Sequence, residues 1–283
     1  MGTARLASRG GLKLRSERAA LTSQLTFDEG VARQIESLYQ TRDAARRRQL
    51  VKAALSAQPG DQVLDVGSGP GFYCFEIADE VGPDGRVVGV DLAEPMLALA
   101  QRRCETKTTV SFKKGDVLGL PVEEASFDRA LCVQVLEYVE SATAGLAEIN
   151  RILRPGGRVV IWDIDWQTLV WHSSHPALTA RILEAWDHHL AHPSLPRTLA
   201  PRLREAGFEQ VEPVAHAFST VAHRDPDTYG AAITPIIATY VVNNGLIDSD
   251  SVDLWLKDQQ ELSDSGEFYF ACVQFCFSAN KSR

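Results

Sequence analysis

Long apolar segments are missing from this chain. The longest stretch without charge or strong polarity in its C-terminal half, residues 231–242, spans only twelve residues and contains Pro235. A bilayer-spanning helix needs about 20 apolar residues, so the sequence predicts no membrane span. Net positive charge is missing as well, because the formal net charge is −8. Such a chain has no field that attracts a polyanion, which makes nucleic acid a poor candidate partner.

Closely spaced cysteine pairs are also missing. The five cysteines stand at positions 74, 104, 132, 272 and 276 and form no C-x-x-C pair. Without such a pair and without a recognisable signal peptide, we expect a cytoplasmic protein with reduced thiols. Cys272 and Cys276 lie four residues apart, which places them on one face of an extended strand, most simply as small core residues.

The chain is predicted to hold one domain behind a basic N-terminal arm. Basic residues cluster in residues 1–27, and residues 28–283 are expected to form the domain. Short β-branched runs alternate there with helical patterns, which is typical of an α/β fold. Strands are expected at residues 62–67, 85–92, 109–116, 127–135 and 157–164. Two segments interrupt this rhythm, at about residues 167–195 and 225–263, and are expected to be insertions.

Three glycines within five positions follow the first predicted strand. Gly67, Gly69 and Gly71 stand at a strand-to-helix turn, where a ligand can approach the backbone and free N–H groups favour negative charge. Their spacing differs from the G-x-G-x-x-G of nicotinamide-binding folds. Asp91 closes the second strand, where a carboxylate can accept both hydroxyls of a ribose. Asp116 closes the third strand, where it can meet an adenine amino group.

This ordered set of segments resembles the class I S-adenosylmethionine-dependent methyltransferases. The resemblance rests on VLDVGSGPG, VVGVDLAEPML, GDVLGLP, FDRALCVQVLEYV and LRPGGRVVI, and covers about residues 35–165. Within the family, EINRILRPGGRVVI is similar to the ubiquinone/menaquinone C-methyltransferase type and its small-molecule relatives. The resemblance implies a seven-stranded Rossmann-like sheet of order 3-2-1-4-5-7-6, with the last strand antiparallel and helices on both faces. The two insertions are then expected to fold over the strand ends as a helical substrate cap.

The resemblance also implies where S-adenosylmethionine, the methyl donor, binds. Asp65 is expected to orient the glycine loop and approach the methionine amino group, and Asp91 to hold the ribose. Tyr39 resembles an N-terminal tyrosine that folds over the sulfonium, with a simple core contact as the alternative. Gln134 follows the fourth strand, where the family points a group at the methionine moiety, with a surface-loop role as the alternative. The remaining residues expected at the cofactor are Gly67, Ser68, Gly69, Leu92, Met96, Asp116 and Val117.

Acids, histidines and tryptophans gather after the fifth predicted strand, in WDIDWQTLVWHSSHP (162–176). Asp165, with Asp163 and His172 as further candidates, is the hypothesised base that takes or orients a proton of the acceptor. Strand alternation is expected to send both aspartates to one face, where flanking indoles would raise the pKa of a carboxyl. The alternative is that the aspartates cap the next helix or bind loop amides.

A further cluster, DHHLAH, holds His188, His189 and His192. This spacing is compatible with metal binding on a helix, but the pattern fixes no acidic fourth ligand. A solvated histidine face is the favoured interpretation, so no metal is predicted.

The predicted function is in-line methyl transfer from S-adenosylmethionine to a carbon, oxygen or nitrogen of a small, partly apolar acceptor. An arsenite methyltransferase would need several convergent thiols, and the five cysteines are scattered. Two other functions stay open: a non-catalytic S-adenosylmethionine-binding protein and, less favoured, a nicotinamide-dependent oxidoreductase.

Overall fold

The computed structural model describes residues 28–283, so the basic arm predicted for residues 1–27 lies outside the described residues. The strands are β1 (Gln62–Val66), β2 (Arg86–Asp91), β3 (Val110–Lys114), β4 (Phe127–Val133), β5 (Leu153–Ile164), β6 (Val170–Trp171), β7 (Phe208–Thr220) and β8 (Phe270–Lys281). The helices are α2 (Glu29–Gln40), α3 (Arg42–Leu55), α4 (Phe72–Val81), α5 (Glu94–Arg103), α6 (Ala142–Ile152), α7 (Pro176–Asp187), α8 (Pro196–Glu205), α9 (Tyr229–Asn243) and α10 (Ser249–Ser265). Two short 3₁₀ turns are η1 (Leu136–Tyr138) and η2 (Trp166–Thr168).

One sheet runs through the described part of the chain. Strands β3, β2, β1, β4 and β5 lie in that order and are parallel, and β8 pairs antiparallel with β5 on one side and with β7 on the other. If the short strand β6 is left out of the numbering, β7 is the sixth strand and β8 the seventh. The observed order is then the predicted 3-2-1-4-5-7-6, so the predicted fold class is confirmed. The two-residue strand β6 is an addition that pairs with the beginning of β8.

Helices cover both faces of the sheet. On one face, α3 packs through Val51 in an apolar cluster that also holds Val63 of β1. On the other face, α6 and α8 pack through Leu146 and Leu199 in a second cluster, which holds Leu64. Neighbouring residues of β1 thus enter opposite layers, as the alternation of a strand requires.

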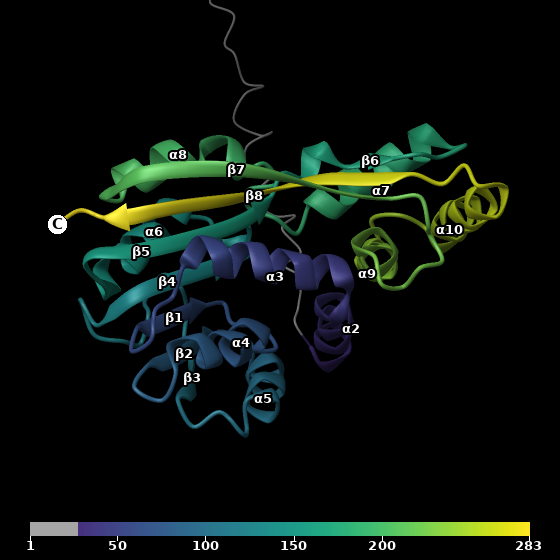
Figure 1. The fold of residues 1–283 in the computed structure, drawn as a ribbon. Helices are drawn as coiled ribbons and strands as arrows, with labels where there is room; N and C mark the ends of the chain where they lie inside the picture. Colours follow the sequence, from purple (N-terminus) through teal and green to yellow (C-terminus); the bar gives the residue numbers. More distant parts are fainter. Residues whose placement is uncertain (1–27) are drawn as a thin grey trace, which may run out of the picture.

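Four further helices gather where the parallel strands end. In Figure 1, β8 points toward the C-terminus at the left, so the parallel strands run to the right, where α2, α7, α9 and α10 lie. Helix α7 contacts both α9 and α10, and α9 contacts α2. Helices α7, α9 and α10 fall within the two predicted insertions. Among the described residues, no helix is long and apolar enough to cross a membrane.

The predicted core role of the two cysteines in β8 is confirmed. Cys272 and Cys276 are buried in the same apolar cluster as α3. The other three cysteines are buried as well, and none of the five forms a disulfide.

Candidate active site

A cavity of about 660 Å³ lies at the ends of the parallel strands. Its wall comes from the loops after β1, β2, β3 and β4 on one side and from α2, α7 and α9 on the other. The predicted cofactor-site residues that line it are Tyr39, Gly67, Gly69, Asp91, Leu92, Met96, Asp116, Val117 and Gln134. Asp65 and Ser68, the other two, are buried and do not contribute to the wall.

The glycine loop is held in a left-handed backbone conformation at all three glycines. The φ angles of Gly67, Gly69 and Gly71 are 70°, 50° and 79°. A Cβ atom on Gly67 would lie 2.1 Å from Cγ2 of Val135, and one on Gly71 would lie 2.8 Å from Cβ of Ala100. A Cβ atom on Gly69 would meet nothing within 4 Å. Gly67 and Gly71 therefore permit close packing, whereas Gly69 leaves open space beside the cavity.

Asp91 fastens the loop from the end of β2. Its Oδ2 accepts a hydrogen bond from the Gly69 N–H at 2.8 Å, and its Oδ1 accepts one from the Ala93 N–H at 2.9 Å. Burial raises the pKa of Asp91, and these backbone donors oppose that shift.

The side chain of Leu92, next to Asp91, is 62% exposed at the cavity wall. An apolar side chain left in water at this position provides a contact surface for a flat apolar group.

Asp65 lies buried beneath the loop rather than in the cavity wall. Its Oδ2 accepts from the Cys74 thiol, with Sγ at 3.3 Å. Burial raises the pKa of Asp65 to about 7. Its expected contact with the methionine amino group stays a prediction.

Gln134 has an unusual backbone conformation at the end of β4. Its φ of 53° is left-handed, which is uncommon for a residue other than glycine and is often found at functional sites. Its N–H donates to the Trp162 carbonyl at 2.8 Å. The Gln134 side chain accepts from Nη1 of Arg47. Because Trp162 of β5 holds its backbone and Arg47 of α3 holds its side chain, Gln134 presents a preorganised side chain to the cavity.

Arg47 is a buried cation beside the cavity that the sequence analysis missed. It is 1% exposed, and its guanidinium carbon lies 4.7 Å from the ring centroid of Tyr39. Burial raises the pKa of the Tyr39 hydroxyl, while the nearby Arg47 charge lowers it. Tyr39 also stacks on Phe72, with ring centroids 5.9 Å apart. Helical spacing was the available signal, because Arg47 follows Ala44 by three residues and precedes Val51 by four, on the buried face of α3.

The side of the cavity opposite the glycine loop is apolar and aromatic. Its wall is formed by Ile35, Leu38, Tyr138, Trp166, Trp186, His189, Tyr229, Ile233 and Ile236. Five of these, Trp186, His189, Tyr229, Ile233 and Ile236, come from α7, α9 or the turn that follows α7, within the predicted insertions. Trp186 packs edge-on against both Trp166 and Tyr240, with centroids 5.6 and 5.4 Å apart. This half of the cavity matches a flat, largely apolar ligand.

Two carboxyl groups lie behind this wall. Glu137 is fully buried, and its Oε2 accepts from the Trp166 indole N–H at 2.6 Å. Burial raises the pKa of Glu137 to about 7. Burial and the neighbouring Glu137 charge raise the pKa of Asp163 well above its ordinary value. Because the two buried carboxyl groups are neighbours, a negative charge on one disfavours a negative charge on the other.

Asp163 and Asp165 have different surroundings at the end of β5. Strand β5 ends at Ile164, and Asp165 begins the turn η2 as its N-cap, accepting from the Gln167 N–H at 3.2 Å. Its Oδ2 also pairs with Nε of Arg197 at 2.6 Å. Asp165 therefore caps a turn and binds a loop amide, the alternative that the sequence had left open.

The third candidate base lies at a strand edge. His172 follows β6 with an exposed side chain, and its N–H donates to the Tyr269 carbonyl at 3.0 Å. None of Asp163, Asp165 and His172 is among the described residues that line the cavity. Their catalytic roles stay predictions.

The predicted histidine face is wrong for one of its three members. His188 is exposed, but His189 is 3% exposed and lines the cavity. No group of three or more His, Cys, Asp or Glu side chains within residues 28–283 could hold a metal ion. The segment DHHLAH does contribute a histidine to the cavity wall. The packing of α7 against α9 decides that this histidine is His189.

A family comparison agrees with this geometry. The chain matches a family model described as a methyltransferase domain over residues 57–207, more than half of its length. The chain therefore belongs to this methyltransferase family. The predicted methyltransferase family and the predicted Rossmann-like fold are therefore confirmed.

Curated relatives match parts of the chain. It is 35% identical over 222 residues to an uncharacterised 37.1 kDa protein in transposon TN4556 of Streptomyces fradiae, covering 75% of this chain and 63% of the relative. It is 36% identical over 163 residues to an arsenite methyltransferase of Halobacterium salinarum, covering 57% and 40%. It is 37% identical over 112 residues to a demethylmenaquinone methyltransferase of Lactococcus lactis subsp. lactis, covering 39% and 44%. The chain thus spans less than two thirds of each of these relatives.

Solved structures share the fold. One is a phosphoethanolamine N-methyltransferase 2 of Haemonchus contortus in complex with S-adenosyl-L-methionine, with a TM-score of 0.59 and 16% identity over 94% of this chain and 60% of that one. Another is the [4+2]-cyclase SpnF, with a TM-score of 0.53 and 20% identity over 84% of this chain and 80% of that one. At these identities the likeness concerns the fold alone.

Proposed function

We propose that this chain transfers the methyl group of S-adenosylmethionine to a small, flat, partly apolar acceptor. One observation carries the proposal: the two halves of the site share a single cavity of about 660 Å³. Gly69 and Asp91 line one half, and Trp166 and Ile233 line the other. Cavities of roughly 300–1,000 Å³ are typical of small-molecule sites.

The residues in the first half fit the cofactor. Asp91 and the open face of Gly69 suit a ribose close to the backbone, and Tyr39 and Gln134 suit the methionyl end. The apolar residues around the nucleoside would be Leu92, Met96 and Val117. When bound, S-adenosylmethionine supplies a methyl group bonded to a sulfonium sulfur, and this sulfur leaves as a neutral thioether. The protein's own part is then alignment of the acceptor and exclusion of water, which the aromatic wall favours.

Thiol chemistry does not support an arsenic acceptor. All five cysteines are buried, and none is among the described residues of the cavity wall. Burial raises the pKa of Cys272 and Cys276 to about 12, so these thiols resist forming the thiolates that bind arsenic or metals. The similarity to an arsenite methyltransferase therefore reflects the shared domain rather than a shared acceptor.

Calorimetry with S-adenosylhomocysteine and with NADH tests the cofactor. We expect a saturable isotherm for S-adenosylhomocysteine and none for NADH, and the reverse result would contradict the proposal. Methyl transfer is then sought by mass spectrometry with a panel of phenols, quinols and amines. Cofactor binding without transfer to any of them would favour the alternative, a non-catalytic S-adenosylmethionine-binding protein.

The proposed base is tested once an acceptor is known. Asp165→Asn, Asp163→Asn and His172→Gln are compared with wild type in single-turnover transfer at saturating cofactor. Loss of a participating base costs about 10²–10⁴ in rate. Because Asp165 pairs with Arg197, Arg197→Gln is the control that disturbs the pair but keeps the carboxylate. Equal losses in Asp165→Asn and Arg197→Gln would contradict a role for Asp165 as base.

A further inference from the structure

His189 is a polar side chain within an aromatic wall. It follows α7, is 3% exposed and lines the cavity next to Trp186. Its ring centroid lies 3.9 Å from that of Trp186, 5.7 Å from that of Tyr138 and 5.2 Å from that of Tyr240. Packing among aromatic rings fixes the imidazole in place on the acceptor side of the cavity.

The imidazole of His189 is held in one tautomer. Its Nδ1 is hydrogen bonded to the backbone carbonyl of Trp186. Because a carbonyl oxygen can only accept, Nδ1 carries the proton and Nε2 carries a free lone pair. Burial lowers the pKa of His189 to about 4, so the ring is neutral around physiological pH and Nε2 stays an acceptor.

Two polar atoms in this wall are unpaired within the part of the chain that the structure describes. Nε2 of His189 and the indole nitrogen of Trp186 are buried and have no hydrogen-bond partner among residues 28–283. Unpaired buried polar atoms cost free energy, and a ligand with matching groups recovers it. Nε2 needs a donor, and the indole N–H needs an acceptor. A hydroxyl group is both.

Both signs of charge are present at or beside the cavity. The Arg47 guanidinium lies against Tyr39, which lines the cavity. Two of its nitrogen atoms, Nε and Nη2, have no hydrogen-bond partner in the described part of the chain. Carboxylates line the cavity itself at Asp91, Asp116 and Glu140, so the choice of acceptor rests on hydrogen bonding. An ammonium group donates but cannot accept from the Trp186 indole N–H, whereas a hydroxyl does both.

We propose that His189, together with Trp186, recognises a hydroxyl group on a flat, largely apolar acceptor. Nε2 of His189 accepts the hydrogen bond of the hydroxyl, and the Trp186 indole N–H donates to the hydroxyl oxygen. His189 positions and selects the acceptor in this arrangement. The inference rests on the proposed function and narrows its acceptor class to hydroxylated aromatic molecules.

The test uses naphthol and its methyl ether as probes, because they share a ring system and only naphthol donates a hydrogen bond. Both are titrated by calorimetry into the protein saturated with S-adenosylhomocysteine. We expect wild type to bind naphthol about tenfold more tightly than the ether, as one satisfied buried hydrogen bond predicts. His189→Phe keeps the aromatic wall and should abolish this preference. His189→Gln offers an acceptor oxygen and should restore part of it, while His188→Phe, at an exposed position, should leave it unchanged.

Nitrogen NMR supplies an independent readout. In the S-adenosylhomocysteine complex, Nε2 of His189 should give the resonance of an unprotonated nitrogen and should shift on addition of naphthol but not of the ether. Equal affinity of wild type for both probes, or an unmoved Nε2 resonance with naphthol bound, would overturn the inference and leave the proposed function intact. Absence of S-adenosylhomocysteine binding in the first titration would instead contradict the proposed function itself.

Discussion

Gly67 and Gly69, the two glycines on either side of Ser68, have different physical reasons to lack a side chain. A Cβ atom at position 67 would overlap Val135 at 2.1 Å, whereas one at position 69 would meet nothing within 4 Å. We expect Gly67→Ala to destabilise the fold by roughly 2–4 kcal/mol through overpacking and backbone strain. Gly69→Ala should cost only about 1 kcal/mol, from its left-handed φ.

The two variants should differ in the opposite direction in their effect on cofactor binding. Gly69→Ala should lower the affinity for S-adenosylhomocysteine more than its small effect on stability explains. The methyl group of Gly69→Ala enters the space beside the cavity, so its S-adenosylhomocysteine affinity should fall although the fold is kept. Urea denaturation and calorimetry measure the two effects separately. A Gly69→Ala protein that binds as wild type would place the cofactor away from this loop.

Asp91 holds the glycine loop in place and is also the residue expected to bind the ribose of the cofactor. Both of its carboxylate oxygens already accept loop N–H groups, from Gly69 and Ala93. Asp91→Ala should therefore loosen the loop as well as remove a ribose contact, and weaken S-adenosylhomocysteine binding at least about tenfold. Glu94→Ala is the matched control, because this nearby side chain is 75% exposed and pairs only with Lys114 among the described residues. Unchanged affinity in a folded Asp91→Ala protein would move the ribose site elsewhere.

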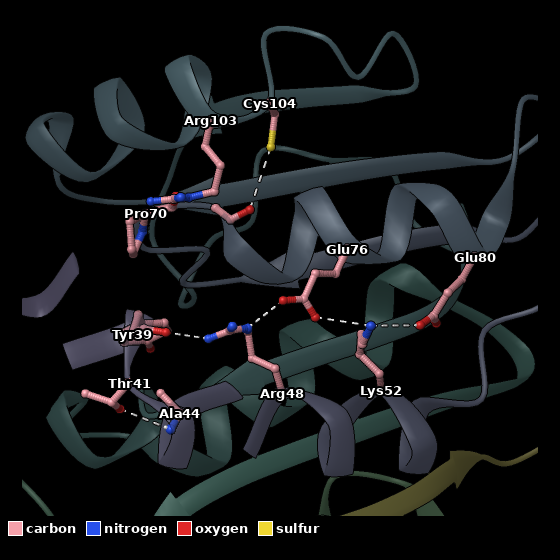
Figure 2. A network of polar contacts seen from close by, with 11 residues as sticks. Tyr39, Thr41, Ala44, Arg48, Lys52, Pro70, Glu76, Glu80, Arg103 and Cys104 are labelled. Atoms are coloured by element: carbon pink, nitrogen blue, oxygen red, sulfur yellow. Dashed lines mark hydrogen bonds and ion pairs between the residues drawn. The ribbon is translucent and has the colours of Figure 1, made fainter. Parts of the chain in front are cut away.

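At the scale of elements, a network of ion pairs links α3 to α4 beside the cavity. Figure 2 shows Glu76 between Arg48 and Lys52, at 2.6 and 3.1 Å, with Glu80 also bound to Lys52 at 3.1 Å. Arg48 donates in addition to the Tyr39 carbonyl, at the end of α2. Glu76 and Glu80 raise the pKa of Lys52 against the opposing effect of burial. The network thus links the position of Tyr39 in the cavity wall to α4.

Removing Glu76 should disturb this link. Glu76→Gln leaves Arg48, with a side chain only 10% exposed, without its carboxylate. We expect a loss of about 1–3 kcal/mol in the free energy of unfolding and faster hydrogen exchange in α2. Glu80→Gln, which breaks only the contact to Lys52, is the control and should leave α2 exchange unchanged. Equal exchange in both variants would mean that Arg48 holds Tyr39 without help from Glu76.

At the scale of the whole molecule, the sequence predicted the parts that local patterns encode. The position of Gly69, Asp91 and Gln134 in the cavity wall could be predicted, because each stands at or just after the end of a parallel strand. The carboxyl ends of parallel strands meet at one edge of a sheet. Asp165 lies one residue beyond the end of β5, and its ion pair with Arg197 of α8 joins residues that no local pattern connects. Helical spacing places Arg47 on the buried face of α3 but does not reveal its contact with Tyr39, and the inward turn of His189 depends on how α7 packs against α9.

The buried carboxyl groups should set how global stability depends on pH. The pKa of Asp65 rises from an ordinary 3.8 to about 7 in the fold, so the folded state binds its proton more tightly than the unfolded state. The contribution of this group is fully present below about pH 4, falls as pH rises through the window between about 4 and 7, and is gone above it. At about 1.4 kcal/mol per pKa unit, the loss for such a shift amounts to a few kcal/mol.

Asp65→Asn removes this titration while keeping an oxygen that can accept from Cys74. The free energy of unfolding, measured by urea denaturation across that window, should therefore fall less steeply with pH in the variant than in wild type. Glu137, whose pKa also rises to about 7, titrates in both proteins, so the difference between the two curves isolates Asp65. Asp79→Asn is the control, since that side chain is 69% exposed, and it should keep the wild-type slope. Parallel curves for Asp65→Asn and wild type would mean that Asp65 is ionised in the fold, and that the glycine loop rests on a buried charge rather than on a neutral acid.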